Sequence, residues 1–195
     1  MDKKILVTAF DAFGGKGYNP SEKLLGMLTG EGVEKALLPT SFSRAPELLR
    51  GKAKAVSPAA IVCLGLASGR SAVSLEFAAL NIKDSDKYAD NDGELASGQS
   101  VIPGAPNALF TSLDLGRIVS KIRESGVPCR VSYHAGTYVC NCVYYHALSL
   151  GVPAVFIHIP DDETSAPSPD APHLSLSGSA KAVSKAISEI ETALG

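Results

Sequence analysis

Cys140, His158 and Glu76, three residues far apart in the chain, stand in settings where their side chains could do chemistry. Cys140 falls in the first turn of the helix predicted for residues 137–150, if Thr137 caps that helix. Free backbone N–H groups and the helix dipole there favour a thiolate and lower the thiol pKa, which suits a nucleophile. A cysteine on an apolar helix is also a common small core residue, so both interpretations stay open.

His158 and Glu76 each interrupt an apolar strand. His158 lies in the strand predicted for 154–159, where burying an imidazole requires a polar partner. It is either a satisfied core histidine or a catalytic base. Glu76 stands among apolar residues of the segment 73–79, and a buried carboxylate is usually paired with histidine or arginine. The alternative for Glu76 is a side chain that faces solvent from an edge strand.

Arg70 and two phenylalanines follow the ends of predicted strands. Arg70 closes the glycine-rich segment 65–70 and could bind a carboxylate or an oxyanion, although a surface arginine is equally compatible with such a loop. Phe10 and Phe13 flank a tight turn, where they either belong to the core or form an apolar slot for a flat ligand. Gly14-Gly15 matches neither the dinucleotide fingerprint nor the phosphate loop, so a nucleotide cofactor is not indicated.

The remaining cysteines and histidines suggest less chemistry. Cys142 lies two residues after Cys140, on a nearly opposite helix face, which suits neither a shared disulfide nor a shared metal. The others are expected in the core, at the surface or in supporting positions: Cys63, Cys129, His134, His146 and His173.

Strands alternate with helices along the chain, which predicts an α/β fold. Strands are expected at 5–10, 33–38, 61–64, 73–82, 130–133 and 154–159, and helices at 21–27, 43–56, 114–125, 137–150 and 177–194. Short apolar strands buried on both faces predict a three-layer α/β/α sandwich with a mostly parallel, partly mixed twisted sheet, formed by a single domain, 1–195. Residues 83–112 fit no element and predict a lid, a binding loop or an oligomer contact.

Ligands of open α/β sheets bind beyond the carboxyl ends of the strands. The segments that follow the predicted strands carry Cys140, Arg70, Phe10 and Phe13, and His158 lies near the end of the last strand. We therefore expect these side chains to gather along one edge of the sheet.

Composition excludes several classes of protein. The 195 residues carry 18 basic and 20 acidic side chains, and a formal charge of −2 provides no basic surface for nucleic acid or anionic membranes. No apolar stretch approaches the roughly 20 residues of a membrane span, and the first residues lack the pattern of a signal peptide. Four cysteines are too few for a disulfide scaffold, so a reducing cytoplasm is expected.

Five motifs, in order along the chain, resemble those of pyrrolidone-carboxylate peptidases (pyroglutamyl peptidase type I). They are Ile5–Gly15 with Asn19-Pro20-Ser21, Gly65–Asn81, Ala89–Gly93, Ala135–Asn141 and Phe156–Pro160. The resemblance implies a Cys–His–acid triad, with Cys140 as nucleophile, His158 as base and Glu76 as the orienting acid. It also implies substrate-binding positions at Phe10, Phe13, Asn19, Leu66, Arg70 and Val139.

The resemblance also defines the expected reaction. The substrates would be peptides with an N-terminal pyroglutamyl residue, hydrolysed through a thioester without metal or organic cofactor by a cytosolic homotetramer. Phe10 and Phe13 would line the lactam pocket. Arg70 and the Cys140 backbone N–H would face the oxyanion.

The chain departs from the family pattern at several positions, among them Ser68 in place of a glycine, and rival interpretations remain. Leu66 stands where many members have glutamine, so only a backbone contact is expected there. Residues 161–163 read Asp-Asp-Glu where Tyr-Ile-Pro is usual, so the resemblance predicts least about that loop. One rival is a catalytically silent binding or thiol-sensing protein of the same fold. The other is a metal site formed by Cys140, Cys142, His134 and His146, although their spacing differs from that of usual zinc ligands.

Overall fold

A six-stranded sheet forms the middle layer of the molecule. The computed structural model describes residues 3–86 and 88–195. The strand order is β2-β1-β3-β8-β4-β7. The strands are β1 (Ile5–Phe10), β2 (Val33–Leu38), β3 (Ala60–Leu66), β4 (Val73–Glu76), β7 (Cys129–Ser132) and β8 (Ala154–Ile159).

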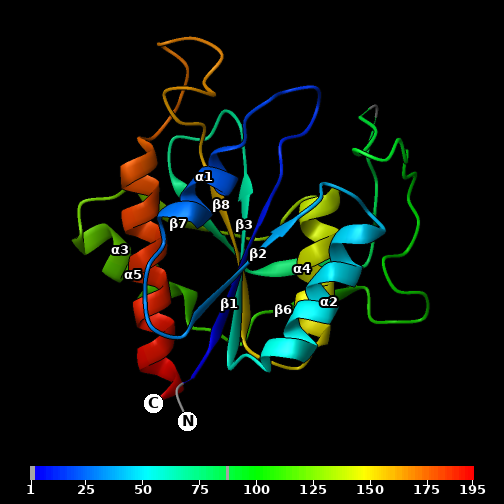
Figure 1. Ribbon diagram of the computed structural model, residues 1–195, viewed down its shortest axis with the longest axis horizontal. Coiled ribbons are helices and arrows are strands. Elements are labelled where there is room, and N and C mark those ends of the chain that lie inside the picture. Colours follow the sequence, from blue (N-terminus) through cyan, green and yellow to red (C-terminus); the bar gives the residue numbers. More distant parts are fainter. Residues whose placement is uncertain (1–2, 87) are drawn as a thin grey trace.

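Helices cover both faces of this sheet, as the sequence predicts. The helices are α1 (Pro20–Met27), α2 (Arg44–Val56), α3 (Leu115–Glu124), α4 (Val139–Ser149) and α5 (Leu176–Leu194). Figure 1 shows α1, α3 and α5 on one face and α2 and α4 on the other. Two buried apolar clusters, one under each helical layer, fill the space between helices and sheet. The predicted three-layer α/β/α sandwich is confirmed.

Neighbouring residues of a strand enter different clusters, because successive side chains point to opposite faces. In β8, Ile157 lies in the cluster under α1, α3 and α5, whereas Phe156 lies in the cluster under α2 and α4. The helices meet these surfaces with residues spaced by three or four. In α5 these are Val183, Ile187 and Ile190, all buried.

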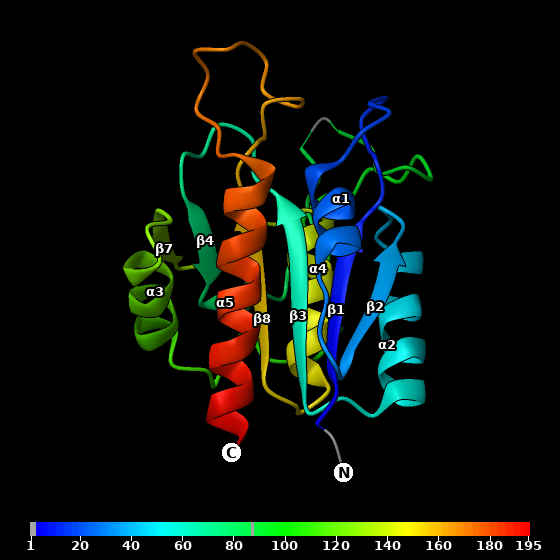
Figure 2. The ribbon, with the colours of Figure 1, turned by 60° about the vertical axis from the view of Figure 1, so that its left-hand side comes forward.

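The sheet is mixed, because the strand direction reverses between β8 and β4. This reversal determines which strands end near the site. β1, β2, β3 and β8 run parallel to one another, but β4 pairs antiparallel with β8, and β7 runs parallel to β4. The carboxyl ends of β4 and β7 therefore do not lie at the edge where β1, β3 and β8 end. Figure 2 shows the loops that follow β1, β3 and β8 together at the upper end of the molecule.

Two predictions about the middle of the chain are wrong. The single strand expected at 73–82 is broken at Phe77 into β4 and β5 (Ala78–Leu80). β5 leaves the main sheet and pairs antiparallel with β6 (Ala108–Phe110). The segment 83–112 therefore contains a strand. With only three residues, β6 is too short to show the alternation of apolar and polar residues that predicts a strand, and the surrounding sequence is rich in turn-forming residues.

Candidate active site

Glu76, His158 and Arg70 form a buried chain of hydrogen bonds. His158 Nδ1 lies 2.7 Å from Glu76 Oε1, and Arg70 Nη1 donates to the same oxygen at 2.9 Å. Glu76 has no solvent exposure and His158 is buried, whereas Arg70 keeps a quarter of its side chain exposed. The solvent-facing alternative for Glu76 is therefore wrong, because the carboxylate has the basic partners that burial requires.

The sheet register brings these residues to the face covered by α4. Leu75 and Ile157 contribute to the cluster under α1, α3 and α5. Strand alternation therefore turns their neighbours Glu76 and His158 toward α4. β4 reaches this position because its register pairs Ser74 with His158 and Glu76 with Phe156 on β8.

The Cys140 sulfur lies over the same part of the sheet. A Cβ placed on Gly65 would be 3.1 Å from Cys140 Sγ. Gly65 is paired in register with His158 on the neighbouring parallel strand, and adjacent strands lie about 4.8 Å apart. The thiol, the imidazole and the carboxylate thus come from α4, β8 and β4 to one face of the sheet at neighbouring register positions.

The beginning of α4 differs from the prediction. The N-cap residue is Tyr138 without a side-chain cap, and Cys140 is the second residue of the helix. Thr137 instead donates its hydroxyl to the Asp84 carbonyl at 3.2 Å. The buried Asn141 side chain bonds the backbone of Leu80 and Ile82, which ties the first turn of α4 to the segment after β5.

The expected low pKa of the Cys140 thiol is also contradicted. Burial raises the pKa of this thiol to about 12, and the Glu76 carboxylate adds to the rise. The backbone N–H at the helix start and the Arg70 cation act in the opposite direction but do not balance burial. The resting nucleophile is therefore a neutral thiol that needs a base.

The pKa values of Glu76 and His158 are shifted in directions that allow His158 to act as the base for this thiol. Burial alone would raise the pKa of Glu76, but His158 and the hydrogen bonds from Ser132 and Arg70 outweigh it and hold the pKa below its ordinary value. Burial lowers the pKa of His158, and the Arg70 cation adds to this against the opposing effect of Glu76. Because the ionised Glu76 can only accept, the His158 Nδ1–H donates to it and Nε2 keeps its lone pair.

The aromatic residues expected at the lactam pocket differ in burial. Phe10 ends β1, is 3 % exposed and places its ring 6.3 Å from that of Phe156. Phe156 in turn packs 4.7 Å from the His158 ring. Phe13 is only partly buried on the turn that follows β1. The core interpretation therefore holds for Phe10, and Phe13 is the ring with an accessible surface.

The other expected substrate-binding residues have side chains that are buried, partly exposed or already hydrogen-bonded within the protein. The Asn19 side chain caps α1 through Ser21 and donates to the Asp11 carbonyl at 2.8 Å, so its polar groups hold the turn itself. Val139 is fully buried in the core under α4. Leu66 ends β3 with partial exposure. Arg70 bonds Glu76 rather than standing free to meet an oxyanion.

Gly65 and Tyr144 also belong to this region, although neither is predicted as a site residue from the sequence. Gly65 leaves the space into which the Cys140 sulfur and the Phe156 ring fit, since a Cβ there would be 2.7 Å from that ring. Tyr144 donates its hydroxyl to the Glu76 carbonyl at 2.9 Å and fixes the end of β4 to α4. No sequence signal distinguishes this glycine from the turn glycines that follow it.

The other cysteines and histidines do not take part in the hydrogen bonds of Glu76, His158 and Arg70. Cys63, Cys129 and Cys142 are buried in the core. His146 is buried against Arg50, His134 is exposed, and His173 is partly buried. Within 3–86 and 88–195, no group of three histidine, cysteine, aspartate or glutamate side chains could hold a metal ion, and no helix there is long and apolar enough to cross a membrane.

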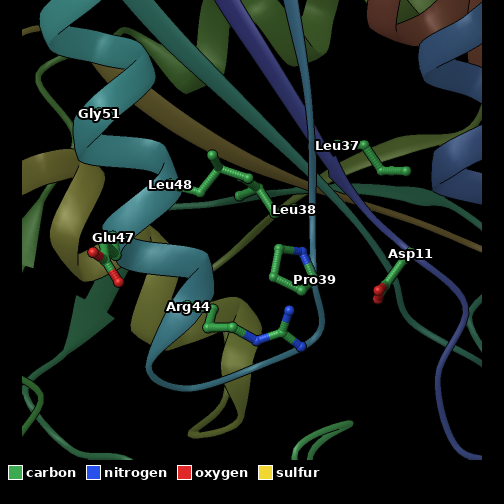
Figure 3. Close-up of a pocket in the computed structure, with 8 residues that line it drawn as sticks. All are labelled: Asp11, Leu37, Leu38, Pro39, Arg44, Glu47, Leu48 and Gly51. Carbon is green, nitrogen blue, oxygen red and sulfur yellow. The ribbon is translucent and has the colours of Figure 1, made fainter.

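A hollow of about 640 Å³ lies apart from this chain of hydrogen bonds. Figure 3 shows that it is bounded by the end of β1, by β2 and by α2. Its lining residues are Asp11, Leu37, Leu38, Pro39, Arg44, Glu47, Leu48 and Gly51. None of them is a predicted site residue, so this hollow does not define the substrate pocket of the thiol.

Comparisons with known proteins agree with the architecture and its motifs. A model of the pyroglutamyl peptidase family matches residues 3–193. The pyrrolidone-carboxylate peptidase 1 of Caldanaerobacter subterraneus is 40 % identical over 98 % of this chain and 99 % of that protein. The crystal structure of pyroglutamyl peptidase I from Bacillus amyloliquefaciens superposes with a TM-score of 0.93 at 34 % identity, covering 98 % of this chain and 96 % of that one. The pyrrolidone carboxyl peptidase of Thermus thermophilus gives 0.88 at 36 % identity, covering 94 % and 98 %.

Proposed function

The chain belongs to the pyroglutamyl peptidase family, and from that premise we propose that Cys140, His158 and Glu76 cleave N-terminal pyroglutamate from peptides. Membership makes the protein a cysteine peptidase of the pyroglutamyl peptidase I class. The observation that carries the proposed triad is the buried 2.7 Å contact between His158 and Glu76, on the sheet face where the Cys140 sulfur covers Gly65.

In the proposed mechanism, His158 Nε2 accepts the Cys140 proton as the sulfur attacks the carbonyl carbon that follows the lactam ring. Glu76 holds the imidazole in the required tautomer and stabilises the imidazolium that forms. The S–C bond forms, and the carbonyl oxygen becomes an oxyanion, which the Cys140 backbone N–H at the start of α4 stabilises. His158 then protonates the leaving amine, the C–N bond breaks, and a thioester remains.

Water completes the cycle. His158 accepts a proton from water as the water oxygen attacks the thioester, and Cys140 leaves with that proton while pyroglutamate is released. No step uses a metal ion or an organic cofactor. The raised pKa of the thiol and the lowered pKa of His158 support proton transfer during attack rather than a thiolate formed beforehand.

The lactam is flat and uncharged, so its site needs apolar walls and few polar groups. Phe13, with its partly exposed ring next to the end of β1, is the side chain that we propose contacts the lactam. Phe10 supports the site from the core through Phe156. The homotetramer and the cytoplasmic location remain predictions of the family resemblance.

Hydrolysis of a fluorogenic pyroglutamyl amide tests this function. Cys140→Ala and Cys140→Ser are expected to remain folded and to lose nearly all turnover. Cys142→Ala, two residues along the same helix, is the matched control and should keep its activity. Full turnover in Cys140→Ala would overturn the proposal. A wild-type protein that does not hydrolyse the amide but responds to oxidation of its thiol would favour the thiol sensor.

Glu76→Gln separates orientation from nucleophilicity. The amide is nearly isosteric but stabilises the wrong imidazole tautomer and no imidazolium, so kcat should fall by roughly 10²- to 10⁴-fold. Alkylation of Cys140 should still be stoichiometric in this variant, because the thiol is intact. Unchanged kcat in Glu76→Gln would remove Glu76 from the triad.

A further inference from the structure

Two adjacent aspartates that follow β8 are buried. Asp161 has no exposure and Asp162 is 3 % exposed. Across 3–86 and 88–195, neither carboxylate forms an ion pair with a lysine, arginine or histidine. A buried charge costs free energy unless hydrogen bonds compensate it. The groups that hydrogen-bond to these carboxylates therefore indicate what they stabilise.

The Asp161 carboxylate binds the turn that carries Arg70. Its Oδ2 accepts from the Gly69 backbone N–H at 3.2 Å, and its Oδ1 accepts from the Ser68 hydroxyl at 3.1 Å. A third donor, the Ser165 hydroxyl, reaches Oδ1 at 3.0 Å. The turn itself is closed by the Arg70 N–H on the Ala67 carbonyl at 3.3 Å. One carboxylate thus fixes both middle residues of the turn.

This turn fixes the backbone from which Arg70 reaches Glu76. Arg70 follows Gly69 directly, and its Nη1 donates to Glu76 Oε1 at 2.9 Å. The same oxygen receives the His158 Nδ1–H at 2.7 Å. Figure 2 shows the loop after β3 and the loop after β8 at the same end of the molecule. Asp161 is therefore linked to the imidazole in three steps: it bonds Gly69, the next residue Arg70 bonds Glu76, and Glu76 bonds His158.

Asp162 anchors a different loop. Its Oδ2 accepts from the Tyr18 hydroxyl, which belongs to the segment between β1 and α1. Its Oδ1 accepts from the backbone N–H groups of Thr164 and Ser165 at 3.1 and 2.8 Å. Asp162 therefore connects the loop after β8 to the loop that carries Phe13.

We propose that Asp161 is a positioning residue that holds Arg70 against Glu76 and so sets the charge around His158. The proposal rests on the proposed function of His158 as the catalytic base. Asp162 shares Ser165 with Asp161, but its Oδ2 links the loop to Tyr18, between β1 and α1, and not to the turn that carries Arg70.

A carboxylate at position 161 accepts from all three donors that meet there. The Gly69 N–H is a fixed donor pointing at Oδ2, whereas the two serine hydroxyls can rotate. Asparagine keeps an oxygen for that N–H only by turning its NH₂ group toward the serines, whose hydroxyls must then rotate from donating to accepting. Ser165 Oγ already accepts from the Asp162 N–H, and the negative charge that holds these donors is lost. The turn should then loosen and the guanidinium should withdraw from Glu76.

The charged and titratable groups around the His158 ring are Glu76 on β4, Arg70 on the turn and Cys140 on α4. The Arg70 cation disfavours the imidazolium, whereas Glu76 favours it. Withdrawal of Arg70 therefore raises the pKa of His158, and the acid limb of the kcat/KM profile should move to higher pH. A purely structural defect would lower the amount of active protein without moving that limb.

The test compares Asp161→Asn, Arg70→Gln and the double variant. Asp161→Asn is expected to lower kcat about tenfold and to shift the acid limb upward, as Arg70→Gln does. Because both changes act through one contact, their effects should be clearly less than additive in the double variant. Asp170→Asn, an exposed change of the same charge in the same loop, is the matched control and should leave both quantities unchanged.

Two further measurements keep the proposal falsifiable. NMR titration of the His158 imidazole reports its pKa without any substrate, so a failure of the peptidase function would not hide the effect. Ser68→Ala removes one donor to Asp161 and serves if Asp161→Asn does not fold, with a smaller shift in the same direction expected. An unmoved imidazole titration in the folded Asp161→Asn, or in Ser68→Ala if the first is unfolded, would overturn the proposal, as would fully additive effects with Arg70→Gln.

Discussion

Gly65 lies directly beneath the Cys140 sulfur, and a Cβ on this glycine would be 3.1 Å from Sγ. The same Cβ would be 2.7 Å from the Phe156 ring, which packs against the His158 ring at a tilt of 53°. A single missing side chain therefore leaves room for both the nucleophile and the ring that supports the base. The glycine is required here by space in the middle of the sheet, and not by a turn.

Gly65→Ala is expected to displace the Phe156 ring or the Cys140 thiol and to lower kcat at least tenfold, because small misplacements of reacting groups are costly. Gly51→Ala is the matched control, since nothing lies within 4 Å of the added methyl on α2. That control should keep full activity and gain a little stability, about 1 kcal/mol or less. Wild-type kcat and unchanged thiol reactivity in Gly65→Ala would contradict the geometry.

The pH dependence of kcat/KM should reflect a base whose pKa is lower than usual. His158 can accept the thiol proton only while it is neutral, so activity is lost as the pH falls through its pKa, which burial lowers below 6.5. The acid limb should therefore lie below pH 6.5 in the wild type. A profile measured with the fluorogenic amide checks this, and a limb above pH 7 would contradict it.

Alkylation of Cys140 provides an independent view of the same site. Because burial raises the pKa of the thiol to about 12, the iodoacetamide rate should keep rising with pH beyond pH 9 instead of reaching a plateau. Cys140→Ser, which lacks the sulfur, gives the background from the three other cysteines. A plateau below pH 8 would show a resting thiolate and contradict the neutral thiol.

Phe10 and Phe13 should respond differently to truncation. Phe10→Ala empties a core position and is expected to cost about 3–5 kcal/mol in the free energy of unfolding. Phe13→Ala changes a partly exposed ring and should raise KM for the pyroglutamyl amide with little change in Tm. Denaturant unfolding and steady-state kinetics on both variants separate these outcomes. An unchanged KM in Phe13→Ala would remove this residue from the proposed substrate site.

The three layers and most of the helices and strands can be predicted from local patterns in the sequence. Asn19-Pro20 predicts the start of α1 correctly because capping is a local interaction. The spacing of Val183, Ile187 and Ile190 predicts α5 for the same kind of reason, since one amphipathic period is visible within a single segment. The five motifs also predict the family, which the comparisons confirm.

The connections within the site depend on contacts between segments that are distant in the sequence. The direction of β7 and the break at Phe77 depend on which strand pairs with which, and no short segment contains that information. The pKa of Cys140 rises instead of falling because desolvation by distant segments exceeds the local effect of the helix start. Likewise, the contact of Asp161 with Gly69 joins two loops that are 92 residues apart in the chain, because only folding brings the carboxylate and its hydrogen-bond donor within reach.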